Sequence, residues 1–321
     1  MAGTEDLEFV STVQDLRAEY ETKRQSTNLY FVEGRAILDV VIEIAKYGDK
    51  DVDVYLYWFE QGSDIIFIRL SDIPGTLSGD VLRLYCNLPP HTGHLEIHGN
   101  RFRPLHDAPP VPQASTADDE DVSDELARLP IVLIDPASTF AKKPKYRSEI
   151  VNLLKVQGSE HIITLLGRTE DGLLVFPKHA KVYSMFAEAT SIKQYKTWIL
   201  QLLLGLKDLH QAGIIHRDLR LNNLLADGDC LLVCDLESRR GNRTAPEISR
   251  HDTLDAGWSE QSDIWDIGQC IKCMIYANDP INNAVEWPVP PPFAAIVEAC
   301  QRRNPEDRAS LDQLLDMVRS I

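Results

Sequence analysis

The sequence lacks the features that mark membrane, secreted and disulfide-bonded proteins. No uncharged apolar run approaches the roughly 20 residues that a membrane-spanning helix needs. The first six residues, Met1-Ala-Gly-Thr-Glu-Asp6, contain no signal-peptide core, and the six cysteines are scattered without the spacing of a disulfide framework. We therefore expect a soluble protein without membrane contact, located in the cytoplasm, with the nucleus as an alternative.

Positive charge is also scarce. The chain has 33 Lys and Arg against 49 Asp and Glu, and its formal net charge is -16. A surface of this sign repels nucleic acid, so we expect no nucleic-acid partner. Seven of the acids fall between Leu105 and Ala127, a stretch with no Lys or Arg that is rich in Pro, Ala, Ser and Asp. This composition predicts a mobile acidic loop or linker over residues 105–127.

One cysteine pair has the spacing of a metal site. Cys270 and Cys273 are separated by two residues, and no second pair accompanies them. The surrounding residues 267–275 have the apolar rhythm of a buried helix. Core packing is therefore favoured over metal binding.

Upstream of the acidic stretch, the sequence predicts helices and then strands. Residues 7–24 place apolar side chains at helical spacing, and the apolar residues 36–45 are also predicted to be helical. A hairpin is predicted next, because two runs rich in β-branched and aromatic residues flank Gln61-Gly-Ser63. The strands expected in this region are 52–59, 65–70, 81–88 and 94–98.

Downstream of the acidic stretch, a few strands give way to helices. The longest helix is expected over residues 191–211, where seven large apolar side chains recur at helical spacing. A strand-rich part followed by a helical part indicates the α+β class. The other elements expected are strands at 131–134, 162–166 and 173–176 and a helix at 146–156.

The octapeptide His216-Arg-Asp-Leu-Arg-Leu-Asn-Asn223 carries the strongest chemical signal. Asp218 can accept a hydroxyl proton, Arg220 can neutralise phosphate charge, and the Asn223 carbonyl can hold a magnesium ion. This stretch resembles the catalytic loop of the protein kinase superfamily.

Further motifs in the family's order extend the resemblance over most of residues 131–318. Asp235-Leu-Glu237 stands where the family has Asp-Phe-Gly, and Ala245-Pro-Glu247 matches its Ala-Pro-Glu. Asp263-Ile-Trp-Asp-Ile-Gly268 resembles the central helix of the large lobe, where Asp263 would brace the catalytic loop. Arg308 in Asn304-Pro-Glu-Asp-Arg308 would pair with Glu247.

The resemblance implies a two-lobed fold, with a small strand-rich lobe and a larger helical lobe. It divides the chain into an amino-terminal extension or diverged small-lobe region (1–104), the acidic linker (105–127), the rest of the small lobe (128–180) and the large lobe (181–321). ATP and Mg²⁺ are the implied cofactors. Asp218 and Arg220 would be catalytic, Asn223 and Asp235 would bind metal, and Glu149 would be the helix glutamate of the nucleotide site.

Three departures from the family pattern concern the ATP side of the site and the segment that follows Asp235-Leu-Glu237. No G-x-G-x-x-G motif is present. Asp135, directly after the predicted strand 131–134, stands where the family has a lysine. A cation for Glu149 must therefore come from Lys142, Lys143 or Lys145. Only seven residues, 238–244, separate Asp235-Leu-Glu from Ala245-Pro-Glu, which leaves little room for a phosphorylation switch and predicts a fixed segment.

These features leave three functions open. The first is a divergent kinase-like phosphotransferase that moves the ATP γ-phosphate to a hydroxyl, on protein Ser or Thr. The second is a pseudokinase that acts as a binding or scaffold module. The third, minor one is a small-molecule kinase, because Glu237 could be an additional metal-facing carboxylate. The partners expected are ATP and a protein substrate or protein partner.

Overall fold

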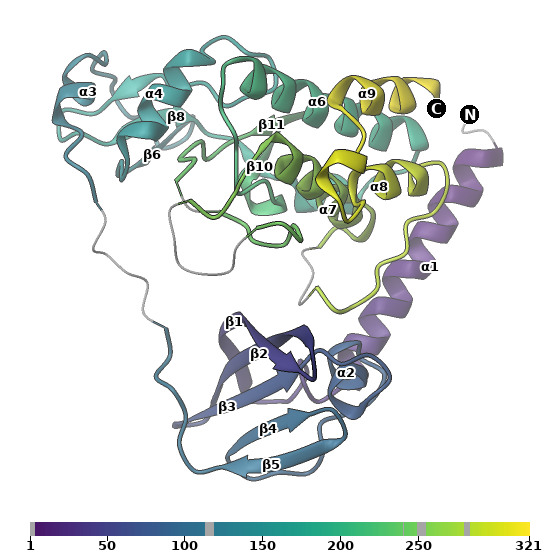
Figure 1. Cartoon of the computed structure of the whole chain (residues 1–321). Helices are drawn as coiled ribbons and strands as arrows, with labels where there is room; N and C mark the ends of the chain where they lie inside the picture. The colour runs from purple at the N-terminus through teal and green to yellow at the C-terminus, as the bar shows by residue number, and fades with distance from the viewer. Residues whose placement is uncertain (1–3, 113–118, 240, 249–254, 279–282) are drawn as a thin grey trace. The chain divides into compact units, whose positions relative to one another are not determined.

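The computed structural model describes residues 4–112, 119–239, 241–248, 255–278 and 283–321 (Figure 1). The chain forms two compact units. The smaller unit comprises Gln14–Ser115 and Pro280–Trp287, and the larger unit comprises Met1–Val13, Thr116–Asp279 and Pro288–Ile321. Helix α1 (Thr4–Ser26) contributes residues to both units and confirms the predicted helix at 7–24.

The smaller unit is built on a five-stranded sheet in the order β1-β2-β3-β4-β5. All neighbouring strands are antiparallel except β3 and β4, which are parallel. Helix α2 contacts β3 and β4. The elements are β1 (Arg35–Tyr47), β2 (Lys50–Gln61), β3 (Asp64–Ser71), α2 (Leu77–Leu82), β4 (His94–His98) and β5 (Arg101–Leu105).

Strand β2 is central to this unit because both of its faces are buried. Tyr55, Tyr57 and Phe59 point into one core cluster, while Val54, Leu56 and Trp58 belong to a second cluster. This alternation follows from the two-residue period of a strand. The predicted hairpin and the predicted strand at 94–98 are confirmed.

Two predictions in the smaller unit were wrong. Residues 36–45 form part of β1, not a helix, and pair with β2 over its whole length. The stretch is rich in Val and Ile, which suit a pleated surface, and a continuous apolar run does not by itself distinguish helix from strand. Residues 81–88 contain the end of α2 and a turn instead of a strand. The neighbours Val81 and Leu82 are both fully buried, and Arg83 is held by an ion pair with Asp72.

The larger unit has a small sheet at one end and helices at the other (Figure 1). The sheet order is β6-β8-β7, and a second sheet, β11-β10-β9, lies in the helical part. This arrangement confirms the α+β class and the helices predicted at 146–156 and 191–211. The elements are α3 (Ser123–Ala127), β6 (Thr139–Lys142), α4 (Arg147–Lys155), β7 (Gly167–Arg168), β8 (Leu174–Pro177), β9 (Ala180–Lys181), α5 (Val182–Ala187), α6 (Ile192–Gln211), β10 (Leu224–Asp227), β11 (Cys230–Val233), α7 (Glu260–Tyr276), α8 (Ala294–Cys300) and α9 (Leu311–Ser320), with 3₁₀ turns at Leu221–Asn223 and Pro305–Asp307.

Helix α6 organises the helical part. Ser191 caps its first turn by accepting a hydrogen bond from the Gln194 backbone, and its apolar stripe from Tyr195 to Leu209 is fully covered. Gly205 allows close approach, because a Cβ there would lie 2.9 Å from the His161 carbonyl oxygen. The buried Cys270 and Cys273 lie on α7, as expected for packing residues.

The strands predicted at 131–134 and 162–166 were wrong. Each of these stretches contributes only one isolated bridge, Ile131 to Arg168 and Ile162 to Val233. Leu133 is 88% exposed, so the apolar character of the first stretch does not reflect a buried strand. The first strand of the small sheet is instead β6, eight residues further along.

The described ends of the predicted linker are packed, in contrast to the expectation of a mobile segment. Val111 packs beside the Trp58 cluster, and residues 123–127 form α3. Residues 113–118 lie outside the described part. The domain boundaries expected at 104, 127 and 180 remain predictions. Among the described residues, no helix combines the length and apolar character needed to cross a membrane.

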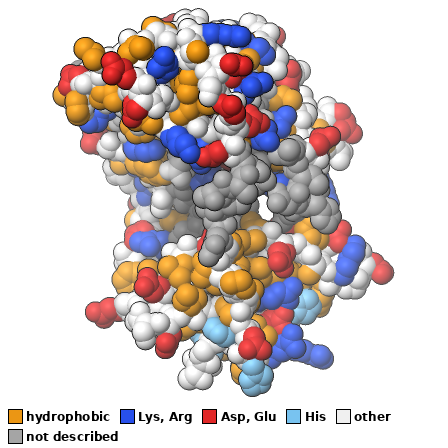
Figure 2. Space-filling view, turned by 90° about the vertical axis from the view of Figure 1, so that its left-hand side faces the viewer, with side chains coloured by type: hydrophobic (Ala, Val, Ile, Leu, Met, Phe, Trp, Pro, Cys, Tyr) orange, Lys and Arg blue, Asp and Glu red, His pale blue; other side chains and the backbone are white. Residues whose placement is uncertain are grey.

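From the side of α3 and β6, the surface of the larger unit shows acidic and basic side chains interspersed (Figure 2). Several of these charges form ion pairs, including Lys143 with Asp119 and Arg147 with Glu125. At least two acids of the expected linker, Asp119 and Glu125, therefore face local cations.

Candidate active site

A cavity of about 350 Å³ lies between the small sheet and the helical part of the larger unit. Its walls are apolar, and its polar groups converge from both sides. The lining residues include Phe140, Lys142, Glu149, Leu153, Ile163, Phe176, Lys181, Asn223, Leu225, Cys234 and Asp235. A wider groove of about 1190 Å³ lies along α1 and α6, but none of the predicted site residues line it. The smaller cavity is therefore the candidate active site.

Asp263 holds the backbone of the catalytic loop by hydrogen bonds. Its carboxylate accepts hydrogen bonds from the backbone N–H groups of His216 (2.8 Å) and Arg217 (2.9 Å), and it also contacts His210 Nε2 at 2.9 Å. Asp263 is completely buried on α7. The predicted bracing role is present in the structure.

His216 links the two acidic turns of the site. The Asp218 backbone N–H donates to His216 Nδ1 at 3.3 Å, so the ring proton lies on Nε2. That nitrogen is 3.0 Å from the carbonyl oxygen of Cys234, to which it donates. Since Cys234 directly precedes Asp235, the buried imidazole fixes the turn of Asp218 relative to the turn of Asp235.

Asn223 holds the carboxylate of Asp218. The Asn223 Nδ2 group donates to both the Asp218 carbonyl oxygen and Asp218 Oδ2, each at 2.8 Å. With its nitrogen used in this way, the Oδ1 atom of Asn223 is the part of the amide left for a cation. No hydrogen bond to that oxygen is found among the described residues.

Burial raises the pKa of the Asp218 carboxyl, although Arg220 and His216 act in the opposite direction. A raised pKa makes a carboxylate a better proton acceptor. Arg220 is exposed, and its positive charge lies near enough to Asp218 to lower the pKa of that carboxyl. Within the described part of the chain no acid forms an ion pair with Arg220, so its guanidinium can meet a phosphate group.

Lys142 is the cation for Glu149 that the sequence left open among three lysines. It ends β6, and its Nζ lies 2.7 Å from Glu149 Oε1, 3.0 Å from Asp235 Oδ1 and 3.8 Å from Glu237 Oε1. The placement of the small-lobe strand at 131–134 was therefore wrong, and Thr139-Phe-Ala-Lys142 is the strand that ends in lysine. Of the three candidate lysines, the structure pairs Lys142 with Glu149.

The acids around Lys142 have the donor chemistry of a hard-cation site. Oxygens of Glu149, Asp235 and Glu237 lie within 4.8 Å of one another, and Glu149 Oε2 is buried without a hydrogen-bond partner. Burial, together with the charge of Asp235, raises the pKa of Glu237 to about 7. Oxygen-only donors of this kind fit Mg²⁺ rather than a softer metal.

The segment after Asp235 is held against α4. Asn152 Nδ2 donates to the Leu236 carbonyl oxygen at 2.9 Å and to Ser238 Oγ at 3.2 Å, while Ser148 Oγ donates to the Glu237 carbonyl oxygen at 2.6 Å. These contacts fix residues 236–238 to the helix, while the fixed segment expected over 238–244 stays a prediction.

The predicted pair between Glu247 and Arg308 is also present. Arg308 Nη1 and Nη2 donate to the two carboxylate oxygens at 2.6 and 2.7 Å, and the arginine side chain is completely buried. Its guanidinium lies 5.0 Å from the Trp265 ring centroid. This pair anchors the Ala-Pro-Glu turn to the end of the 3₁₀ turn before α9.

Some cavity residues were not found from the sequence. Lys181 in β9 lines the cavity, and its Nζ lies 3.4 Å from the Asn222 carbonyl oxygen, next to Asn223. Phe140 and Phe176 supply apolar walls from β6 and β8. Alternation along Thr139–Lys142 was the available signal, but four residues are too few for a periodic pattern to stand out.

Comparison with known proteins agrees with this geometry. The family model of the protein kinase domain matches residues 134–318, more than half of the chain. Similar proteins include the mitogen-activated protein kinase kinase kinase ANP1 of Arabidopsis thaliana, 29% identical over 49% of this chain and 28% of that protein. Another is the serine/threonine-protein kinase Nek6 of Oryza sativa subsp. japonica, 32% identical over 37% of this chain and 27% of that protein.

The matched region spans less than a third of the length of each of these relatives. The similarity therefore concerns a domain and not a whole relative. The motifs from Lys142 to Arg308 all fall within the matched residues. This chain belongs to the protein kinase domain family.

Proposed function

We propose that this protein is an active kinase that transfers the γ-phosphate of ATP to a Ser or Thr hydroxyl of a protein. The family in general uses ATP and a divalent metal. The observation that carries the proposal is that Lys142, Glu149, Asn223 and Asp235 line one cavity, and that Asn223 holds the carboxylate of Asp218 next to it. A chain that had lost catalysis would not need all of these groups together.

In this proposal the substrates meet across the cavity. The adenine ring enters between the apolar walls that include Phe140 and Phe176, and Lys142 contacts the phosphates. The acceptor oxygen attacks the γ-phosphorus while its proton passes to Asp218, the bond from the γ-phosphorus to the bridging oxygen breaks, and ADP leaves. Arg220 neutralises charge on the transferred group.

Asn223 and Asp235 would hold the metal ion, and Glu237 is an additional donor. When bound, Mg²⁺ neutralises charge on the nucleotide phosphates. Lys142 already touches Asp235, so this lysine also keeps the metal-binding carboxylate near the cavity. These residues account for the metal and phosphate chemistry without a glycine-rich loop.

A scaffold function is the second candidate. The missing G-x-G-x-x-G motif and the short segment 238–244 favour it, because both weaken the grip on ATP and on a peptide substrate. In that case the cavity would still bind nucleotide, or would be kept only as part of the fold.

One experiment separates the candidates. Thermal unfolding is followed with ATP, with Mg²⁺ and with both, and transfer from γ-labelled ATP is then measured on mixed Ser/Thr peptides. We expect magnesium-dependent stabilisation and transfer by the wild type, and binding without transfer by Asp218→Asn. Binding without transfer by the wild type would support the scaffold, and no binding would exclude nucleotide use.

A further inference from the structure

We propose that Glu120 is a positioning residue that holds α4, and thereby Glu149, in the arrangement needed for the pair with Lys142. Glu120 comes from the acidic stretch before the small sheet, outside every motif of the site. The inference deepens the proposed function, since its effect on turnover rests on that function. The effect of Glu120 on the position of α4 does not rest on the proposed function.

One oxygen of Glu120 caps α4. Glu120 Oε2 accepts a hydrogen bond from the backbone N–H of Arg147, the first residue of the helix, at 2.9 Å. The Glu120 backbone N–H donates to the Lys145 carbonyl oxygen, also at 2.9 Å, which fixes the approach of the chain. An anion at a helix amino terminus is stabilised by the unpaired N–H groups and the helix dipole.

The other oxygen reaches the segment after Asp235. Glu120 Oε1 forms an ion pair with Arg239 Nη1, and the Arg239 guanidinium lies 5.1 Å from the Tyr146 ring centroid. The carbonyl oxygen of Arg239 accepts a hydrogen bond from Arg217 Nη1 at 3.3 Å. One carboxylate thus connects the start of α4 to the segment that packs on the residue before Asp218.

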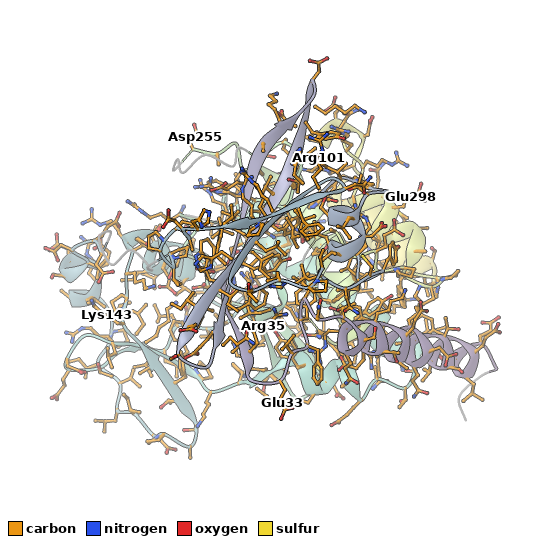
Figure 3. The ribbon with its side chains drawn as sticks, turned by 90° about the horizontal axis from the view of Figure 1, so that it is seen from below. Glu33, Arg35, Arg101, Lys143, Asp255 and Glu298 are labelled. Atoms are coloured by element: carbon orange, nitrogen blue, oxygen red, sulfur yellow. The ribbon has the colours of Figure 1, made fainter. Side chains whose placement is uncertain are left out.

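Neighbouring acids anchor the stretch that carries Glu120. Asp119 pairs with Lys143 at 2.6 Å, and Glu125 pairs with Arg147 at 2.9 Å. Lys143, labelled in Figure 3, directly follows β6, so these contacts bracket the turn between β6 and α4. Glu120 therefore does not depend on a single exposed pair to stay in place.

This arrangement explains how a segment of only seven residues can be organised. Arg239 in this segment forms an ion pair with the carboxylate of Glu120, which belongs to the same chain. Ser148 and Asn152 then fix the segment to the same helix that Glu120 caps. These contacts thereby keep Glu149 in place for its ion pair with Lys142.

The test compares Glu120→Gln with Asp124→Asn, which removes an equal charge from an exposed position on α3. Hydrogen–deuterium exchange is measured for peptides covering α4, together with the dissociation constant of Mg-ADP and, where transfer is found, kcat and KM. We expect α4 amides to exchange about five- to tenfold faster in Glu120→Gln, from loss of the cap and the ion pair, and to stay unchanged in Asp124→Asn.

A double variant, Glu120→Gln with Arg239→Gln, adds a second criterion. Because the two residues share one interaction, its effect on α4 exchange should be smaller than the product of the two single effects. Wild-type exchange of α4 in Glu120→Gln, or independent effects in the double variant, would overturn the proposal. If the wild type transfers no phosphate, the proposed activity fails while the exchange data still decide the role of Glu120.

Discussion

Lys142 Nζ lies 2.7 Å from Glu149 Oε1, and the glutamate side chain is only 2% exposed. The pair joins the last residue of β6 to the first turn of α4. Because the same nitrogen also contacts Asp235, the cation connects both lobes of the larger unit across the cavity. Burial raises the pKa of Glu149, with a smaller rise from the charge of Asp235, and Lys142 opposes both.

Lys142→Met should destabilise the fold by about 2 kcal/mol or more, because it leaves a buried carboxylate without its cation. The pKa of Glu149 should then rise further above its value in the unfolded chain. The variant should therefore lose stability relative to the wild type as pH rises above about 4.5. Urea unfolding between pH 5 and 8 measures this; Lys143→Met, at an exposed pair, is the control and should show no such trend.

Glu237 should give magnesium binding a pH dependence. Its pKa of about 7 means that the carboxylate forms as pH rises through neutrality. The rise in melting temperature caused by Mg²⁺ with ADP should therefore grow from pH 6 to pH 8, and Glu237→Gln should remove that growth. An unchanged slope would show that Glu237 does not face the metal, and Glu188→Gln, at an exposed position, serves as the charge control.

Without metal, the ionisation of Glu237 should lower the stability of the fold as pH rises. The folded pKa lies above the ordinary value of 4.5, so the stabilising contribution is present below that value and is lost as pH rises through about 7. Glu237→Gln should become more stable than the wild type above neutrality. Thermal unfolding in chelator-treated buffer provides the measurement, and equal stability of the two proteins at pH 8 would contradict it.

Two acids on α7 should respond differently to the same substitution. Asp263→Asn replaces an acceptor of two backbone hydrogen bonds with a group that donates on one side, and should cost about 3 kcal/mol. Burial raises the pKa of Asp266 well above its usual range, and the charge of Asp263 adds to the rise, so the neutral carboxyl is favoured there. Asp266→Asn should therefore cost less than about 1 kcal/mol. Equal losses in chemical denaturation would refute this assignment.

Arg308→Lys should loosen the Ala-Pro-Glu turn. A lysine cannot reproduce the two parallel hydrogen bonds to Glu247, so we expect a loss of about 2 kcal/mol. A double-mutant cycle with Glu247→Gln should give a coupling energy of about 1–3 kcal/mol. Additive effects would indicate that Arg308 acts mainly through its contacts with the Gln261 and Arg302 carbonyl oxygens.

The catalytic side of the site could be predicted from the sequence because its residues occur in contiguous motifs. Asp218 and Asn223 are five residues apart, and Asp263 and Arg308 stand in short patterns whose contacts the structure contains. The functional roles of Asp218, Arg220, Asn223, Asp235 and Glu149 remain proposals.

The ATP side could not be predicted in the same way. Lys142 ends a strand of four residues, too short for a periodic signal, and the more apolar stretch 131–134 competed with it. Residues 36–45 show the same limit, since only the pairing with β2 decides between helix and strand. Glu120 was hidden by composition, because an acidic stretch gives no indication of which of its carboxylates meets a helix amino terminus.

Two residues at the heart of the site adopt left-handed backbone conformations, Arg217 with φ of 72° and Asp235 with φ of 64°. Such a conformation costs a side-chain-bearing residue of order 1 kcal/mol, and glycine avoids the cost. Asp235→Gly should relieve this backbone cost, although it also removes the contact with Lys142, and it should abolish the magnesium-dependent shift. The chain thus gives up folding stability where Asp235 stands, a trade-off typical of residues kept for chemistry rather than for architecture.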